Sequence, residues 1–161
     1  MVAEGLDATR MAAWRSFLEA HRRTTARLAR ELQDDEDLPL TWFDVLVQLS
    51  EAPSGSLRMQ DLADRVLLSQ SGLTRLVDRM EAEGLVARER CREDGRGTLA
   101  TLTRAGLERL RRAWPTHVEG VRAAFADVLT EEEARVLAGA LGRVAAASTP
   151  SGASGGSDDP A

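Results

Sequence analysis

The stretch Ser69–Arg79, which reads SQSGLTRLVDR, constrains the fold more than any other part of the sequence. On a helix, its apolar residues recur at spacings of three and four and share one face with Met80. Such a helix must pack one face on a hydrophobic core and leave the other face accessible. The accessible face carries small hydroxyls, an amide and guanidinium groups, on Gln70, Ser71, Thr74, Arg75 and Arg79.

This accessible face has two interpretations. Hydroxyl, amide and guanidinium side chains are the ones that read base edges and hold phosphates in the major groove of DNA. Ser69 stands at the N-cap position, so the start of the helix would also direct backbone N–H groups at a phosphate. The alternative is an ordinary amphipathic helix with a solvated polar face. The neighbouring segments favour the first interpretation.

The segments before this helix predict a helix-turn-helix. A short helix over Met59–Val66 has an apolar face of Leu62, Ala63 and Val66, and the brief connection Val66-Leu67-Leu68 leads into Ser69. A helix, a short turn and an amphipathic second helix form the motif whose second helix reads DNA.

The segments after the helix predict a wing. Leu85–Cys91 and Thr98–Thr103 look like two strands, and the Asp-Gly pair between them is a strong hairpin signal. The tip of such a wing carries Arg92 and Arg96, of which Arg96 can enter a minor groove or hold a phosphate. Asp94 would support the wing by pairing with a nearby arginine. The alternative is an ordinary surface hairpin.

A long helix over residues of about 8–33 precedes this region. Its apolar seam follows heptad steps and needs a partner, either from later in the chain or from another subunit. His21 and Thr25 interrupt the seam, either as polar groups that set its register or as the lining of a ligand cavity. The seam consists of Met11, Trp14, Leu18, His21, Thr25, Leu28 and Leu32. An acidic loop is expected at Asp34–Asp37, followed by a helix capped by Thr41 with Asp44 at the capping-box distance.

The C-terminal part of the chain predicts two more helices. The first runs from Arg104 toward Leu129, and Pro115 should kink it or start a new segment because the proline ring clashes with the preceding turn. Residues 148–161 are rich in Gly, Ser, Pro and Asp and should be disordered. Thr130 and Glu133 form a capping box for the last helix, whose expected inward residues are Val136, Leu137, Ala140, Leu141 and Val144.

The composition is that of a globular protein of one domain, with 161 residues, 43% of them hydrophobic and 29% charged. No apolar run reaches membrane-spanning length and the N-terminus lacks a signal pattern, so we expect no membrane contact and a cytoplasmic location. All 21 basic residues are arginine. From Arg58 to Arg112 the arginines outnumber the acidic residues by three, although the net charge of the chain is −5. This asymmetry suits a localised contact with a polyanion.

Enzyme and metal chemistry find little support in the sequence. Cys91 is the only cysteine, which excludes an intrachain disulfide and a cysteine-based zinc site, and His21 and His117 are far apart. No Ser/His/Asp set and no phosphate-cradling glycine loop is present. We therefore expect no catalytic residues, no metal and no cofactor.

The run MQDLADRVLLSQSGLTRLVDRMEAEGLVARERCREDGRGTLATLTRAG resembles the DNA-binding lobe of the MarR family of bacterial transcriptional regulators. The order and lengths of the helices extend the resemblance to about residues 8–147. The fold that it implies is mainly α with a small β-hairpin wing. Dimerisation helices would occupy about 8–33 and 104–147, and the winged helix-turn-helix lobe about 41–103.

The resemblance also implies a function. The protein would be a homodimer on double-stranded DNA, with the first and last helices of two subunits interleaved, and usually a repressor. Two-fold symmetry requires a pseudo-palindromic operator with half-sites about one helical turn apart. The residues toward bases would be Gln70, Ser71, Thr74 and Arg75, and those toward phosphates Ser69, Arg79 and Arg96.

Many members of the family release DNA when a small aromatic or phenolic ligand binds between the two lobes, and by position Trp14, His21 and Trp42 could line that cleft. Two alternatives stay open. Cys91 lies between Arg90 and Arg92, which favours a reactive thiolate and a redox-responsive regulator, although a plain strand residue also fits. The second alternative is a winged helix that serves only for contact with other proteins and does not bind DNA.

Overall fold

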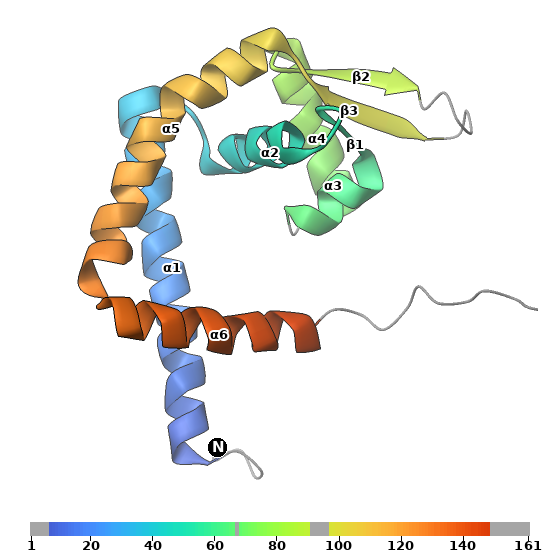
Figure 1. The fold of residues 1–161 in the computed structure, drawn as a ribbon. Coiled ribbons are helices and arrows are strands. Elements are labelled where there is room, and N and C mark those ends of the chain that lie inside the picture. The colour runs from blue at the N-terminus through green and yellow to red at the C-terminus, as the bar shows by residue number, and fades with distance from the viewer. Residues whose placement is uncertain (1–6, 67, 91–96, 149–161) are drawn as a thin grey trace, which may run out of the picture.

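The computed structural model describes residues 7–66, 68–90 and 97–148. It is mainly helical, with one small antiparallel sheet, as the sequence predicts (Figure 1). The helices are α1 (Ala8–Glu36), α2 (Leu40–Glu51), α3 (Met59–Arg65), α4 (Gln70–Ala82), α5 (Arg104–Ala124) and α6 (Glu131–Ala147), with a short 3-10 helix η1 (Ala126–Val128), and the strands are β1 (Ser56–Arg58), β2 (Val86–Arg90) and β3 (Thr98–Leu102).

The sheet confirms the two predicted strands and adds a third. The strand order is β1-β3-β2, and both pairings are antiparallel. The sequence analysis missed β1, which has only three residues and follows the turn at Gly55, where φ is 66°. Ser56 faces Thr101 across the pairing, and their hydroxyl oxygens lie 2.9 Å apart. This strand joins the start of α3 to the base of the predicted wing.

The core lies where α2 and α4 meet the sheet. The predicted apolar face of α4 is buried there, with Leu73 and Val77 fully enclosed. Phe43, Val45, Leu46 and Leu49 of α2 are also buried there. A helix buried to this extent is held on the core mainly by the hydrophobic effect.

The C-terminal end of α1 is longer than expected. The acidic loop predicted at Asp34–Asp37 is wrong, because α1 continues to Glu36 and ends at Asp37, whose φ is 48°. Aspartate tolerates this left-handed conformation better than most residues, and the Asp37 N–H donates to the Gln33 carbonyl at 3.1 Å. Leu38 then enters the core. The burial of Leu38 therefore decides where the helix ends.

The predicted cap of α2 is also wrong. The helix begins at Leu40, so Thr41 lies inside its first turn and cannot cap it together with Asp44. The N-cap is Pro39, which makes no side-chain cap hydrogen bond, and its carbonyl accepts hydrogen bonds from the first turn. The fixed φ of proline is compatible with a helix start, so no polar cap is needed here.

Helices α1 and α5 run side by side and meet at a cluster around Glu36. The Glu36 carboxylate lies 3.3 Å from Nη1 of Arg109 and 3.4 Å from Nε of Arg112, and it accepts a hydrogen bond from Thr116 at 3.3 Å. Arg109 also donates to the Glu36 backbone carbonyl at the C-terminus of α1. A cation at this position complements the helix dipole. Since Glu36 and Arg109 are each only 15% exposed, the pair holds the two helices in register.

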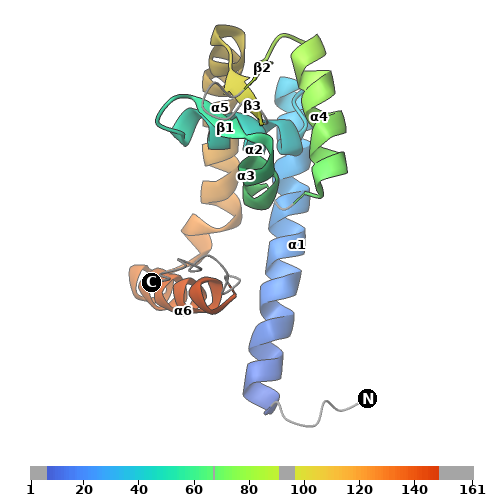
Figure 2. The ribbon, with the colours of Figure 1, turned by 90° about the vertical axis from the view of Figure 1, so that its right-hand side faces the viewer.

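Helix α5 passes through Pro115 without ending there. Figure 1 shows its two halves meeting at an angle, as expected of a helix that contains proline. The helix ends at Ala124, earlier than predicted, and η1 leads to α6. The two views show α6 and the N-terminal part of α1 extending away from the core (Figures 1 and 2).

The predicted capping box of α6 is present, formed by Thr130 and Glu133. The expected inward face of α6 is not covered within this chain, because no residue of the helix is buried. Val136 is 67% exposed and Val144 is 54% exposed. The apolar periodicity is correct, but its packing partner is not among the described residues of the same chain.

A close contact at Gly106 joins α5 to β2. A Cβ atom at this position would lie 2.1 Å from the Leu85 backbone carbonyl oxygen, which cannot move away as a flexible side chain could. We expect Gly106→Ala to lower the free energy of unfolding by about 1–3 kcal/mol, as overpacking does. Chemical denaturation measures this change. Ala105→Ser, at the exposed neighbouring position, is the matched control and should change stability much less; equal effects would contradict the prediction.

Candidate nucleic-acid interface

The N-terminus of α4 is capped as predicted. The Ser69 hydroxyl accepts a hydrogen bond from the Gly72 N–H at 3.2 Å and lies 3.4 Å from the Ser71 hydroxyl. The Thr74 hydroxyl donates to the Gln70 carbonyl at 2.8 Å, so it turns back onto its own helix. Gln70, Ser71 and Thr74 are exposed. The polar face predicted from the sequence is therefore accessible, and its hydroxyls are already ordered by the helix.

The two arginines of α4 are available for an external anion. Within the described part of the chain, the side chains of Arg75 and Arg79 make no hydrogen bond or ion pair. Most other arginines that the structure describes are paired with carboxylates, for example Arg104 with Glu108 at 2.9 Å. An unpaired, exposed guanidinium keeps its full capacity for a phosphate or a guanine edge.

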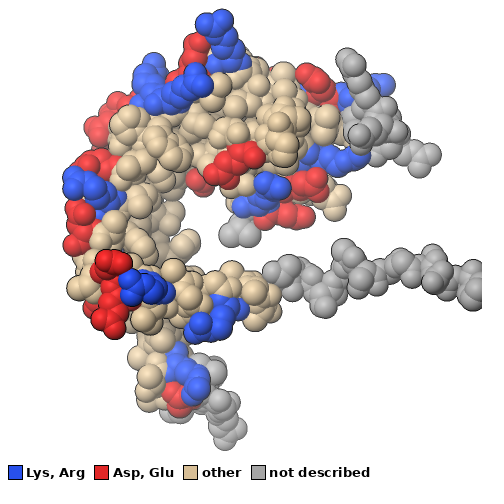
Figure 3. Space-filling view, in the orientation of Figure 1, with Lys and Arg blue, Asp and Glu red and all other residues tan. Residues whose placement is uncertain are grey.

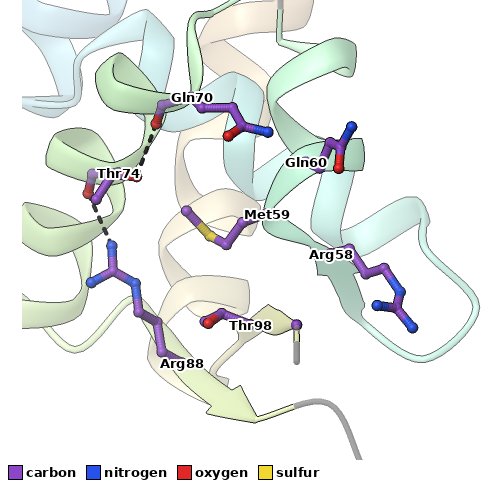
Figure 4. Close-up of a pocket in the computed structure, with 8 residues that line it drawn as sticks. Arg58, Met59, Gln60, Gln70, Thr74, Arg88 and Thr98 are labelled. Atoms are coloured by element: carbon purple, nitrogen blue, oxygen red, sulfur yellow. Dashed lines mark hydrogen bonds between the residues drawn. The ribbon is translucent and has the colours of Figure 1, made fainter. Parts of the chain in front are cut away.

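A groove of about 450 Å³ opens beside α4, between the start of α3 and the base of the wing (Figure 4). Two arginines, Arg58 and Arg88, belong to its lining. Arg88 reaches from β2 to α4 and donates to the Thr74 carbonyl at 2.9 Å. The remaining lining residues are Met59, Gln60, Gln70, Thr74, Gly97 and Thr98.

The sequence analysis missed Arg58, Gln60 and Arg88 as residues of this face. Arg58 and Gln60 belong to β1 and the first turn of α3, and the missed strand hid their proximity to the wing. Arg88 lies in a predicted strand, but nothing in the local sequence indicates that its side chain would bind residues of α4. The excess of arginine over acidic residues between Arg58 and Arg112 was the only signal, and it does not single out a residue.

Four residues of the predicted wing lie outside the described residues: Cys91 at the end of its first strand, and Arg92, Asp94 and Arg96 in the connection that follows. The strands that lead to them are in place, with Arg90 paired to Thr98 at the last described position of the ladder. The roles of Arg92 and Arg96 toward DNA, of Asp94 in the wing and of Cys91 in redox response therefore stay predictions.

The predicted ligand residues lie in two places. Trp14 and His21 are exposed on α1, where Phe17 lies between them with ring centroids 5.9 Å and 6.3 Å away. Trp42 is half-buried near the start of α2. Since α1 rises about 1.5 Å per residue, Trp14 lies roughly 33 Å along the helix from Glu36, where α1 turns toward α2. One chain therefore does not bring Trp14 and Trp42 together.

A second aromatic group joins α2 to α5. The rings of Phe43 and His117 are 4.4 Å apart, and Trp114 lies 6.1 Å from Phe43. Burial lowers the pKa of His117, whose Nδ1 is buried without a hydrogen-bond partner among the described residues. The sequence analysis gave His117 no role.

Figure 3 shows positively and negatively charged side chains spread over the visible face, so this face is not a continuous basic surface. The surface of α6 visible in the same view is largely uncharged between its charged ends.

Comparisons with known proteins agree with this geometry. The model of the MarR family matches residues 36–97. AbsC from Streptomyces coelicolor, a MarR family transcriptional regulator, is 39% identical in sequence, with a TM-score of 0.81 over 90% of this chain and 97% of AbsC. The chain belongs to the MarR family. Sco3205, a MarR family regulator from the same organism whose structure contains DNA, is also 39% identical, with a TM-score of 0.85 over 96% of this chain and 97% of Sco3205.

A curated relative from Bacillus cereus, an uncharacterized HTH-type transcriptional regulator, is 33% identical over 69% of this chain and 72% of its own length. The MarR assignment makes the protein a winged helix-turn-helix transcriptional regulator that binds DNA, and not an enzyme. None of the described helices has the length and apolar content that crossing a bilayer requires.

The environment of His117 generates a prediction about pH. Because folding lowers the pKa of His117, the unfolded chain binds more protons as the pH falls through the ordinary value of histidine, about 6.5. Stability should therefore be complete above about pH 6.5 and fall as the pH is lowered below this value, measured as the thermal midpoint. We expect His117→Gln to flatten this dependence. His21→Gln, which removes an exposed histidine, is the control; an unchanged slope in His117→Gln would contradict the prediction.

Proposed function

We propose that this MarR family protein acts as a homodimeric repressor on a pseudo-palindromic operator and that a small aromatic ligand releases it. The observation that carries the DNA part is the exposed face of α4, where Arg75 and Arg79 have no partner among the described residues. The buried face of the same helix fixes it on the core. A helix held in this way can enter a major groove as a rigid body.

The proposed contacts follow the position of each residue on α4. Gln70, Ser71, Thr74 and Arg75 lie on the exposed first turns and are assigned to base edges. Their amide, hydroxyl and guanidinium groups match the donors and acceptors of the major groove. Ser69 and Arg79, at the cap and in the last turn, are assigned to phosphates, together with Arg92 and Arg96 of the wing, which Asp94 would support.

The proposed dimer explains the apolar surface that the chain leaves open. The exposed large apolar residues of the described chain lie on α1, α5, η1 and α6, and none lies on α3, α4 or the sheet. Trp14 is 50% exposed and Val128 68% exposed. Contiguous exposed apolar surface marks an interaction site. We therefore assign residues of about 8–33 and 104–147 to dimerisation and about 41–103 to DNA binding, within one domain of 8–147.

Ligand release needs a coupling between the two lobes. A ligand would favour a dimer in which the two α4 helices are wrongly spaced, so the bound population would shift. Trp14, His21 and Trp42 are the proposed lining. Because one chain does not bring Trp14 and Trp42 together, this cleft would have to include the partner subunit. Unchanged operator affinity across a panel of aromatic acids and phenols would instead indicate a constitutive repressor.

The first experiment measures fluorescence anisotropy on the intergenic DNA upstream of the gene, with a shuffled duplex as the control. A duplex recovered by selection from random-sequence DNA serves as a second probe, since it does not depend on the position of the operator. Tight, salt-dependent binding that prefers the native or selected sequence supports the proposal. Equal, weak binding to every duplex would contradict it and favour a winged helix used for protein contact.

Two substitutions on α4 should separate base reading from phosphate binding. We expect Arg75→Ala to reduce the preference for the selected duplex over the shuffled one by about 1–3 kcal/mol. Arg79→Ala should weaken binding to both duplexes alike and lower the slope of log affinity against log salt by about one. Arg135→Ala, on α6, is the control and should leave both quantities unchanged. Identical profiles for Arg75→Ala and Arg79→Ala would refute the assignment.

A charge on the apolar face of α6 should weaken the dimer. We expect Val136→Glu to raise the dimer dissociation constant by at least about tenfold, because the carboxylate would be buried without a partner. Sedimentation velocity measures this change. Ala138→Glu introduces the same group on the opposite side of the helix and should leave the dimer intact. A Val136→Glu protein that dimerises like the wild type would exclude α6 from the interface.

A further inference from the structure

Arg88 connects the wing to α4 at several points. Its Nη1 donates to the Asp78 carboxylate and lies 3.6 Å from Oε2 of Glu81, and its Nη2 donates to the Thr74 carbonyl at 2.9 Å (Figure 4). The backbone N–H of Arg88 donates to Oε1 of Glu81 at 3.0 Å. A single residue of β2 thus binds α4 over two helical turns.

The position of Arg88 makes this connection stronger than a surface ion pair. Its side chain is 24% exposed, whereas those of Asp78 and Glu81 are 52% and 41% exposed. Of these three side chains, that of Arg88 is therefore the least exposed. The several N–H groups of its planar guanidinium donate to a carboxylate and to a backbone carbonyl at the same time. Pairs with good geometry and several partners contribute more than isolated exposed pairs. Lysine has one ammonium group and cannot span these acceptors.

The same contacts change the charge that α4 presents to DNA. Asp78 and Glu81 are on the helix that also carries the unpaired Arg75 and Arg79. Two uncompensated carboxylates at this place would repel phosphates and oppose the arginines. Arg88 lies against both carboxylates and offsets their charge.

Building on the proposed function, we infer that Arg88 is a positioning residue for DNA recognition. It fixes the angle of α4 against β2 and compensates Asp78 and Glu81, and it does not itself bind DNA. The wing and α4 therefore enter DNA as one unit, and the specificity of α4 depends on a residue outside it.

The competing assignment is a direct contact between Arg88 and a phosphate, since Arg88 lines the groove beside α4. The two assignments give opposite signs for Asp78→Asn. If Asp78 anchors Arg88, its loss loosens α4 and weakens binding, although a negative charge has left the DNA-binding helix. If Arg88 binds a phosphate, the loss of Asp78 frees Arg88 and reduces repulsion, so binding becomes tighter.

The test is a double-mutant cycle on the full chain, with Arg88→Gln, Asp78→Asn and the double variant. Anisotropy at two salt concentrations on the duplex selected from random DNA measures affinity and salt slope. We expect Arg88→Gln to weaken specific binding about tenfold and Asp78→Asn about threefold, with the double variant no weaker than Arg88→Gln alone. The salt slope should stay within half a unit of the wild type, roughly, because no phosphate contact is lost.

Two further variants sharpen the cycle. Arg88→Lys keeps the positive charge but loses the planar guanidinium, so this variant should bind DNA nearly as weakly as Arg88→Gln. If Arg88 instead contacted a phosphate, lysine at this position would be tolerated. Asp35→Asn removes an exposed carboxylate of α1 outside the ranges assigned to dimerisation and to DNA binding, and it should bind like the wild type. Tighter binding of Asp78→Asn, additive effects in the cycle, or a slope lowered by about one in Arg88→Gln would overturn the inference.

A measurement without DNA separates this inference from the proposed function. If the wild-type protein binds the native, selected and shuffled duplexes equally, the proposed function fails. Hydrogen exchange of the free protein then still tests the role of Arg88. Arg88→Gln should accelerate amide exchange in α4 relative to α2, and Asp35→Asn should not. Unchanged exchange in α4 would show that Arg88 does not position the helix.

Discussion

The structure depends on the burial of one face of α4. Leu73, Val77 and Met80 are fully enclosed in the common core, and the helix lies against α3 and β2. Because this face supplies the packing energy, the other face is free to carry residues that stabilise nothing in the chain. Arg75 and Arg79 are of this kind, since they have no partner within the described residues. A hydrophobic constraint thus leaves free the polar surface on which the proposed recognition depends.

Local signals in the sequence predicted their elements well. The Ser69 cap, the Thr130 capping box and the strand patterns on both sides of the Asp-Gly pair all act within a few residues, and each is confirmed where the structure describes it. The end of α1 and the start of α2 were wrong because burial of Leu38 and the geometry of Pro39 decide them. Arg88 was missed for the same reason, since its partners on α4 become neighbours only after the chain turns.

The helices outside the winged lobe show a different limit of sequence analysis. The seam of α1 and the apolar face of α6 were recognised by their periodicity, but a periodicity does not name its partner. In α1 the partner is partly α5, which covers Leu28 and Leu32 and leaves Trp14 and Leu18 exposed. In α6 no residue is buried by the described part of the chain, and Val136 and Val144 stay exposed. Such surfaces are stable in water only when another surface covers them.

The close approach of Gly106 to Leu85 has a mechanical consequence. With no side chain between them, the start of α5 cannot slide along β2, so the winged lobe must follow every change in the direction of α5. The helix is about 31 Å long, and a rotation of about 5° at one end displaces the other by roughly 3 Å. This is close to the spacing of successive bases, about 3.4 Å. A glycine far from any proposed DNA contact thus couples the direction of α5 to the position of the winged lobe.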